Sequence, residues 1–153
     1  MSIKYDHLIG RPFEHGKTDC YTLIRDFFMD NYGISLTNYA RPDNWWEDES
    51  LDLYNDNYRE EGFTPIDIRP QELRVADCFL MAVNATKANH AAVYIGQGKF
   101  LHHLYGKRSQ VKMYGGIWRD MTVATLRNKN VPIEEPKLEK FDIYPLLPPV
   151  FKK

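Results

Sequence analysis

Residues 89–102 have the sequence Asn-His-Ala-Ala-Val-Tyr-Ile-Gly-Gln-Gly-Lys-Phe-Leu-His. Apolar and aromatic residues on either side of Gly96-Gln97-Gly98 predict two antiparallel strands joined by a tight turn. If all three turn residues lie in the loop, Ile95 pairs with Lys99. The hairpin then carries a histidine near each of its open ends.

The register of this hairpin determines which histidines share a face. A three-residue loop pairs Ala92 with His102 and leaves His90 diagonally adjacent to His102, on the same side of the sheet. A two-residue loop shifts the register by one residue and brings His103 to that side instead. The local pattern leaves both registers open, although a glycine at each end of the loop suits the longer one.

A helix is predicted over about residues 20–32. The preceding residues 10–18 contain glycine and proline at spacings that favour a loop, and Asp19 suits the N-cap position. Apolar residues then recur at helical spacing, at Cys20, Leu23, Ile24, Phe27 and Phe28. Asn31-Tyr32-Gly33 supplies a C-terminal stop, so one face of this helix is expected in the core.

The remaining elements complete an order of helices first and strands second. Ser50 suits the N-cap of a second helix, which would end before Gly62. Strands are expected over residues 78–83, 91–95, 99–104 and 110–114. This order predicts an α+β fold in which the helix that begins at Cys20 packs on an antiparallel β-meander.

The chain is expected to form one domain over residues 1–129, followed by an arm. Residues 130–153 contain five prolines, which favour an extended conformation over a long helix. The same segment also contains apolar residues. We therefore expect it to pack across its own domain or to dock on another protein.

Bulk properties exclude several functional classes. A formal net charge of −1 and a pI near 6.5 give no global basic field, so nucleic-acid binding is not expected. No apolar run approaches the roughly 20 residues needed to cross a bilayer, and the first residues lack the apolar core of a signal peptide. We expect synthesis in the cytoplasm and no membrane insertion.

Cys20 and Cys78 are expected to be free thiols, because they fall in different regular elements. Cys78 lies inside an apolar strand and is expected to be inert core. Cys20 lies in the first turn of its helix, where the helix dipole and unpaired N–H groups favour the thiolate. The alternative for Cys20 is a small buried residue on the apolar helix face.

A cysteine that cleaves an amide needs an imidazole within reach and a further group that orients it. His90, His102 and His103 are candidates for these roles, and their alternative is a surface position or a satisfied place in the strands. A zinc site built from Cys20, His15, His90 or His102 is not favoured, because the chain has no close Cys/His ligand pair before the strands. Neither a metal nor another cofactor is expected.

Three stretches together resemble the NlpC family of papain-like cell-wall cysteine peptidases. They are Gly10-Arg11-Pro12-Phe13 with Gly16 and Asp19-Cys20, then Ala76-Asp77 before an apolar strand, then His90 to His102. The resemblance covers about residues 7–115. The tail-tip members found in long-tailed phages are more similar still, at Arg25-Asp26-Phe27-Phe28, Trp45-Trp46 and Leu101-His102-His103-Leu104 with Ser109.

This resemblance implies Cys20 as nucleophile, His90 as general base and His102 as the residue that orients His90. It therefore implies the register of the three-residue loop. The backbone N–H of Cys20 would donate to the oxyanion. The implied substrate is the stem or cross-bridge peptide of peptidoglycan, and the implied setting is a phage tail tip, with other tail-tip proteins as partners.

Two positions depart from the family pattern near the nucleophile. The tyrosine usual in the preceding loop is Phe13 here, which has no hydroxyl to donate, and the small serine that often follows the nucleophile is Tyr21. His15 is a candidate to replace the missing donor in part, and its alternative is an ordinary loop histidine. Together with Asp19, these residues are expected around the substrate and the oxyanion. Loss of one oxyanion donor typically lowers the rate by about 10²- to 10³-fold.

Two functional hypotheses follow from the resemblance. The first is a tail-tip cysteine peptidase that opens peptidoglycan as the phage tail enters the host cell wall. The second is a structural tail-tip or tail-assembly protein that retains the peptidase fold with little or no activity. Phe13 and Tyr21 favour the second hypothesis, whereas the presence of Cys20, His90 and His102 favours the first.

Overall fold

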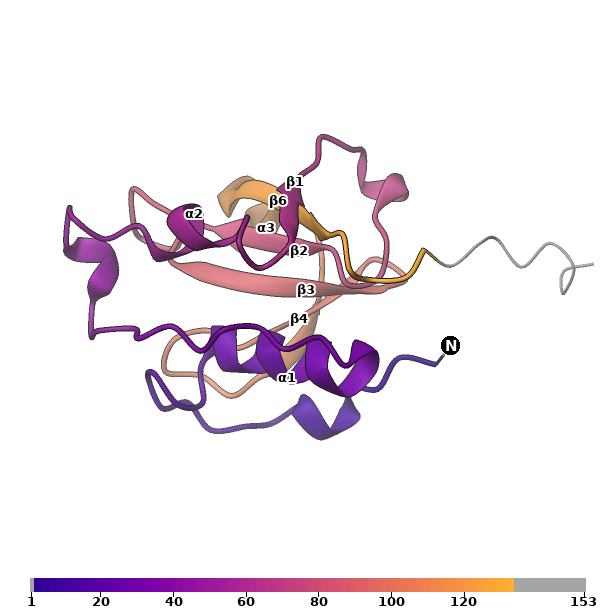
Figure 1. The fold of residues 1–153 in the computed structure, drawn as a ribbon, viewed down its shortest axis with the longest axis horizontal. Helices are drawn as coiled ribbons and strands as arrows, with labels where there is room; N and C mark the ends of the chain where they lie inside the picture. Colours follow the sequence, from indigo (N-terminus) through magenta and orange to yellow (C-terminus); the bar gives the residue numbers. More distant parts are fainter. Residues whose placement is uncertain (1, 134–153) are drawn as a thin grey trace, which may run out of the picture.

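The computed structural model describes residues 2–133 as a single antiparallel sheet flanked by short helices (Figure 1). The strand order is β1-β6-β2-β3-β4-β5. The strands are β1 (Phe63–Pro65), β2 (Cys78–Met81), β3 (His90–Gly96), β4 (Lys99–His102), β5 (Gln110–Met113) and β6 (Thr122–Asn128). The helices are α1 (Cys20–Tyr32), α2 (Leu53–Asn57) and α3 (Gly116–Met121), with 3-10 turns η1 (Asp6–Leu8), η2 (Trp45–Glu47) and η3 (Pro70–Glu72).

Helix α1 has the predicted bounds, and both of its ends have a physical cause. The Asp19 side chain accepts a hydrogen bond from the Thr22 N–H at 3.0 Å, which caps the first turn. Gly33 ends the helix with a left-handed φ of 66°, a conformation that glycine adopts without strain. The helix packs against β3 and β4 (Figure 1), so the predicted α+β arrangement of a helix on an antiparallel meander is confirmed.

The β3–β4 hairpin has the register that pairs Ala92 with His102. The pairing predicted for Ile95 and Lys99 is wrong, because Gly96 pairs with Lys99. The turn is therefore the shorter one, and its two residues, Gln97 and Gly98, have φ values of 55° and 74°. Two left-handed residues in succession are typical of a type I′ hairpin turn, whose twist matches the flanking strands.

A β-bulge reconciles this short turn with the longer register. The pairing shifts between Tyr94 and Gly96, so that Ile95 is left without a cross-strand partner. One unpaired residue displaces the register by one, which is the same displacement that a third loop residue would produce. His102 therefore lies opposite Ala92 although the turn is short.

Strand residues alternate between two apolar clusters. One contains the buried face of α1 together with Cys78, Leu80, Ala91, Val93 and Leu101. The other contains Phe79, Met81, Ala92, Tyr94 and Phe100, with Trp118 of α3 packed against it. Cys78 is buried among apolar residues, as expected of an inert core thiol.

Several predicted boundaries are wrong. The second helix is only α2, because Ser50 closes a turn onto Asp48, to which both its N–H and its hydroxyl donate, and does not cap a helix. Strand β2 ends at Met81, since the Val83 N–H bonds to the Asn89 side chain. Strand β4 ends at His102 and not at residue 104. Strands β1 and β6 and helix α3 had not been predicted.

Most of the predicted arm, residues 134–153, lies outside the described residues, so the division into a domain and an arm stays a prediction. Within residues 2–133, none of the helices combines the length and the apolar character that a membrane span needs.

Candidate active site

His90 and His102 form a hydrogen-bonded pair. His90 begins β3, His102 ends β4, and the Ala92–His102 pairing places their rings in contact. His90 Nε2 lies 2.9 Å from His102 Nδ1, and both residues are buried. Of the two registers that the local pattern left open, the hairpin has the one that places His90 and His102 diagonally adjacent.

The environment of this pair keeps both imidazoles uncharged at neutral pH. Burial, followed by the neighbouring His102 and His103, lowers the pKa of His90 to about 3. Burial, followed by the charge of Lys112, lowers the pKa of His102 to about 4. Each ring then has one nitrogen that carries hydrogen and one that can accept a proton.

Trp118 and Phe100 enclose the His102 ring. Each ring centroid lies 4.8 Å from that of His102, at steep interplanar angles of 82° and 67°. The second nitrogen of His102, Nε2, is buried and makes no hydrogen bond within residues 2–133. His102 therefore has one polar partner there, which is His90.

The Cys20 thiol contacts Tyr54 of α2. The distance from Cys20 Sγ to the Tyr54 hydroxyl is 3.1 Å, and among the described residues neither imidazole of the pair hydrogen-bonds to the thiol. A backbone hydrogen bond from Ala91, the residue after His90, also acts on the sulfur. The structure thus places the nucleophile candidate beside the strand that carries His90, without a direct bond to it.

The expectation that Cys20 favours the thiolate is corrected by this environment. Burial, followed by the negative charge of Asp19, raises the pKa of the Cys20 thiol above its ordinary value of 9.0. Hydrogen bonds from Tyr54 and from the Ala91 backbone act in the opposite direction and do not outweigh burial. The resting site therefore holds a neutral thiol beside neutral histidines.

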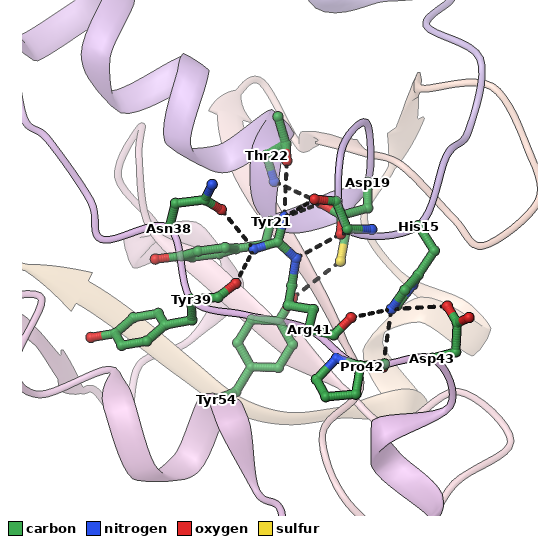
Figure 2. A network of polar contacts seen from close by, with 12 residues as sticks. His15, Asp19, Tyr21, Thr22, Asn38, Tyr39, Arg41, Pro42, Asp43 and Tyr54 are labelled. Carbon is green, nitrogen blue, oxygen red and sulfur yellow. Dashed lines mark hydrogen bonds and ion pairs between the residues drawn. The ribbon is translucent and has the colours of Figure 1, made fainter.

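Asp19 is bound to Arg41 at the start of α1 (Figure 2). Arg41 Nε lies 2.7 Å from Asp19 Oδ2, and the two side chains are only 6% and 4% exposed. The same guanidinium donates to the Thr22 hydroxyl and to the Gly16 carbonyl. Burial raises the pKa of Asp19, but hydrogen bonds from Arg41 and Thr22 outweigh it and lower that pKa below 3.8. Asp19 thus fixes the backbone on both sides of Cys20, the nucleophile candidate.

Phe13 and His15 lie in an aromatic cluster with Tyr105. Phe13 packs on Tyr105 at 4.7 Å and edge-on against His103 at 5.4 Å. His15 packs near Trp46, and its Nε2 donates to the Arg41 carbonyl at 2.9 Å (Figure 2). The His15 donor is therefore engaged with the backbone in this structure.

Tyr21 turns its hydroxyl away from the nucleophile. The hydroxyl donates to the Thr37 carbonyl at 2.6 Å, while the ring packs against Tyr39 and Tyr54. The Arg41 guanidinium lies 5.1 Å from the ring centroid. Tyr21, in the first turn of α1, is thus packed among tyrosines with its hydroxyl bound to the backbone.

Sequence reasoning missed three residues of this site: Arg41, Tyr54 and Trp118. Tyr54 lies within the second predicted helix, between Ser50 and Gly62, and nothing in that stretch indicates its hydroxyl contact. Arg41 lies in a segment without periodicity, and Trp118 lies in the unpredicted helix α3. No local signal connects any of them to Cys20 or His102.

Residues 2–133 contain no group of three or more His, Cys, Asp or Glu side chains that could hold a metal ion.

Together the fold and the site define a protein of the papain-like α+β class. The chain belongs to the NlpC/P60 family, whose model matches residues 10–127.

Two curated relatives carry the name "Tail tip assembly protein K". The protein from Escherichia phage N15 is 40% identical over 125 residues, which are 81% of this chain and 50% of that protein. The protein from Escherichia phage lambda is 36% identical over 123 residues, which are 80% of this chain and 60% of that protein. The chain thus spans about half to three-fifths of the length of these relatives.

Solved structures share the fold at low sequence identity. One is an NLP/P60 family protein from Staphylococcus aureus, described as similar to a lipoprotein, with a TM-score of 0.55 and 20% identity. The match covers 80% of this chain and 38% of the Staphylococcus aureus chain. The NlpC/p60 domain of the peptidoglycan hydrolase SagA has a TM-score of 0.52 and 16% identity, and covers 79% of this chain and 90% of that one.

Proposed function

We propose that this protein is a cysteine peptidase of the phage tail tip that hydrolyses peptide bonds of peptidoglycan during penetration of the host cell wall. The observation that carries the proposal is the buried 2.9 Å hydrogen bond between His90 and His102, with the Cys20 thiol beside the same strand. The family, and the names of the two phage relatives, support the reaction class and the setting.

In the proposed reaction His102 fixes the tautomer of His90. His90 Nε2–H donates to His102 Nδ1, which leaves His90 Nδ1 free to accept a proton. This is the role of the orienting residue in a thiol triad. The remaining proton of His102 then lies on Nε2.

The neutral resting state determines the order of events. Because the Cys20 pKa is raised and the His90 pKa is lowered, the thiol proton moves to His90 as the sulfur attacks the carbonyl carbon. The departing amine takes that proton, and water then hydrolyses the thioester. Hydrogen bonds that are open in a substrate-free site commonly tighten when substrate binds, which supplies the missing contact between Cys20 and His90.

Digestion of purified peptidoglycan, with released muropeptides identified by mass spectrometry, tests this function. Wild type and Cys78→Ala, which removes the buried core thiol, are expected to release cleaved peptides. Cys20→Ala, His90→Ala and a no-enzyme control are expected to show background only. Equal, background-level release by wild type and Cys20→Ala would contradict the peptidase proposal.

A structural role in tail-tip assembly is the second candidate. It is favoured by Phe13, which lacks a hydroxyl, and by the raised pKa of Cys20. In this candidate function other tail-tip proteins are its partners, and residues 130–153 are the proposed docking arm, following an NlpC-like domain over residues 1–129. Complementation of a phage that lacks the protein distinguishes the two: full infectivity with Cys20→Ala supports assembly alone, whereas intact but poorly infecting particles support the peptidase.

A further inference from the structure

The hydroxyl group that Phe13 cannot supply is present at the nucleophile from another part of the chain. Phe13 lies in the aromatic cluster with His103 and Tyr105, whereas the Tyr54 hydroxyl lies 3.1 Å from Cys20 Sγ. We propose that Tyr54 is a catalytic residue whose hydroxyl donates a hydrogen bond to the oxyanion formed when Cys20 attacks a peptide carbonyl. This inference rests on the peptidase function proposed above.

Packing holds the Tyr54 ring in place. Its centroid lies 5.9 Å from that of Trp45 and 6.3 Å from that of Tyr21, in both cases with steep interplanar angles. Trp45 is buried in η2 and Tyr21 is buried in α1. A donor fixed before the reaction is worth more than one that must be ordered by the transition state.

The Tyr54 hydroxyl is suited to donate. Burial, followed by the proximity of Cys20, raises its pKa well above 10.0, so the hydroxyl keeps its proton over the whole range of neutral pH. The hydrogen bond from Tyr54 in turn lowers the pKa of Cys20, as expected if the hydroxyl favours negative charge at the sulfur. The same hydroxyl can donate to the carbonyl oxygen of the substrate, on which negative charge develops when the sulfur attacks.

Formation of the acyl-enzyme needs only the substrate, Cys20, His90 and the two oxyanion donors. The Cys20 sulfur forms a bond to the carbonyl carbon, its proton passes to His90, and the carbonyl π electrons move to the oxygen. Tyr54 O–H and the Cys20 backbone N–H donate to this oxyanion and keep their protons. The C=O bond then re-forms, the C–N bond breaks, and the amine leaves with the proton from His90.

The geometry is consistent with this role because the oxyanion is bonded to the carbon that is bonded to Sγ. A hydroxyl in contact with Sγ lies within hydrogen-bond reach of positions open to that oxygen. The hydroxyl of Tyr21 already donates to the Thr37 carbonyl, and the His15 ring donates to the Arg41 carbonyl. Of these three side-chain donors, Tyr54 is the one in contact with the sulfur.

Steady-state muropeptide release by Tyr54→Phe tests the proposal, because phenylalanine keeps the ring packing and removes only the hydroxyl. We expect kcat to fall by about 10²- to 10³-fold with a much smaller change in KM. Tyr58→Phe, one turn later in the sequence, is the matched control and is expected to retain wild-type kcat. Circular dichroism and thermal unfolding of Tyr54→Phe are expected to match wild type, which shows that the variant is folded.

Each remaining outcome contradicts the inference. A Tyr54→Phe variant as active as wild type would show that the hydroxyl is not needed, and a more active one would show that it blocks the thiol. Failure of the peptidase function itself is distinguished by wild type, whose release would then equal that of Cys20→Ala. A peptide aldehyde, which forms a hemithioacetal with a cysteine thiol, gives a second readout: its affinity is expected to fall by about 10²-fold in Tyr54→Phe.

Discussion

His90 Nε2 and His102 Nδ1 lie 2.9 Å apart in a buried contact between β3 and β4. Two neutral imidazoles can make this bond in only one direction at a time, so the tautomer of one ring determines that of the other. This coupling makes His102 the residue whose replacement most directly tests the proposed base.

Two replacements of His102 are expected to show whether its role is to orient the His90 ring. His102→Asn offers a side-chain oxygen that accepts from His90 Nε2–H, so this variant should keep a substantial part of the wild-type kcat. His102→Ala leaves the His90 donor buried without a partner, and kcat should fall by about 10²-fold or more. Muropeptide release measured under saturating conditions checks both values. Equal activity of the two variants would contradict the orienting role.

The free energy of unfolding is expected to fall as the pH decreases from about 6.5 towards about 4. The folded pKa values of His90 and His102, about 3 and about 4, lie below their ordinary value of 6.5. In this window the unfolded chain binds protons that the folded chain excludes, so stability is complete above pH 6.5 and is lost on acidification. The slope should approach 1.4 kcal/mol per pH unit for each proton of difference, to order of magnitude.

Urea unfolding at a series of pH values measures this slope. His102→Asn should reduce the slope, and a pH-independent free energy of unfolding in wild type would contradict the neutral pair.

Loss of Arg41 is expected to destabilise the protein strongly. Arg41→Met leaves the Asp19 carboxylate buried without its cation, and removing one partner of a buried pair typically costs about 3–5 kcal/mol. The exposed pair Arg69–Glu72 provides the control, because its side chains are 73% and 46% exposed and Arg69→Met should cost less than about 1 kcal/mol. Chemical unfolding of both variants at pH 7 makes the comparison. Similar losses in the free energy of unfolding would show that the buried Asp19–Arg41 pair contributes no more to stability than an exposed pair.

Cys20 is expected to react as an unactivated thiol in the absence of substrate. In a Cys78→Ala background only Cys20 can be alkylated, and the pH at which its iodoacetamide reaction reaches half-maximum should lie above that of the same protein unfolded in urea. The physical reason is that burial and Asp19 both raise the folded pKa. A half-maximum below the unfolded value would show an activated thiolate at rest.

The sequence was sufficient for the elements whose signals are local. Helix α1 has a capping residue, an apolar stripe and a terminal glycine, and all three acted as expected at Asp19 and Gly33. For the β3–β4 hairpin the local pattern left two registers open, and the family resemblance implied the observed one, although through a longer loop than the real one.

The parts that escaped prediction depend on contacts between distant segments. Strand β6 pairs with β2 and β1, far away in sequence, and most of its residues are only partly buried, so its apolar alternation is weak. Arg41 and Tyr54 reach Asp19 and Cys20 from a loop and a five-residue helix. No pattern within either segment indicates its target, since tertiary packing alone brings them together.

The bulge at Ile95 has a consequence for how the third residue of the site is encoded. If Ile95 paired in the regular way with Phe100, each later pair would slide by one, and His103 would lie opposite Ala92 in place of His102. Gly96, at a φ of 95°, provides the backbone conformation next to this bulge. Two adjacent histidines are available in the chain, and a kink in the neighbouring strand selects between them. The identity of the histidine that pairs with His90, and that we propose as its orienting residue, is thus determined by main-chain torsion angles several residues away from either imidazole.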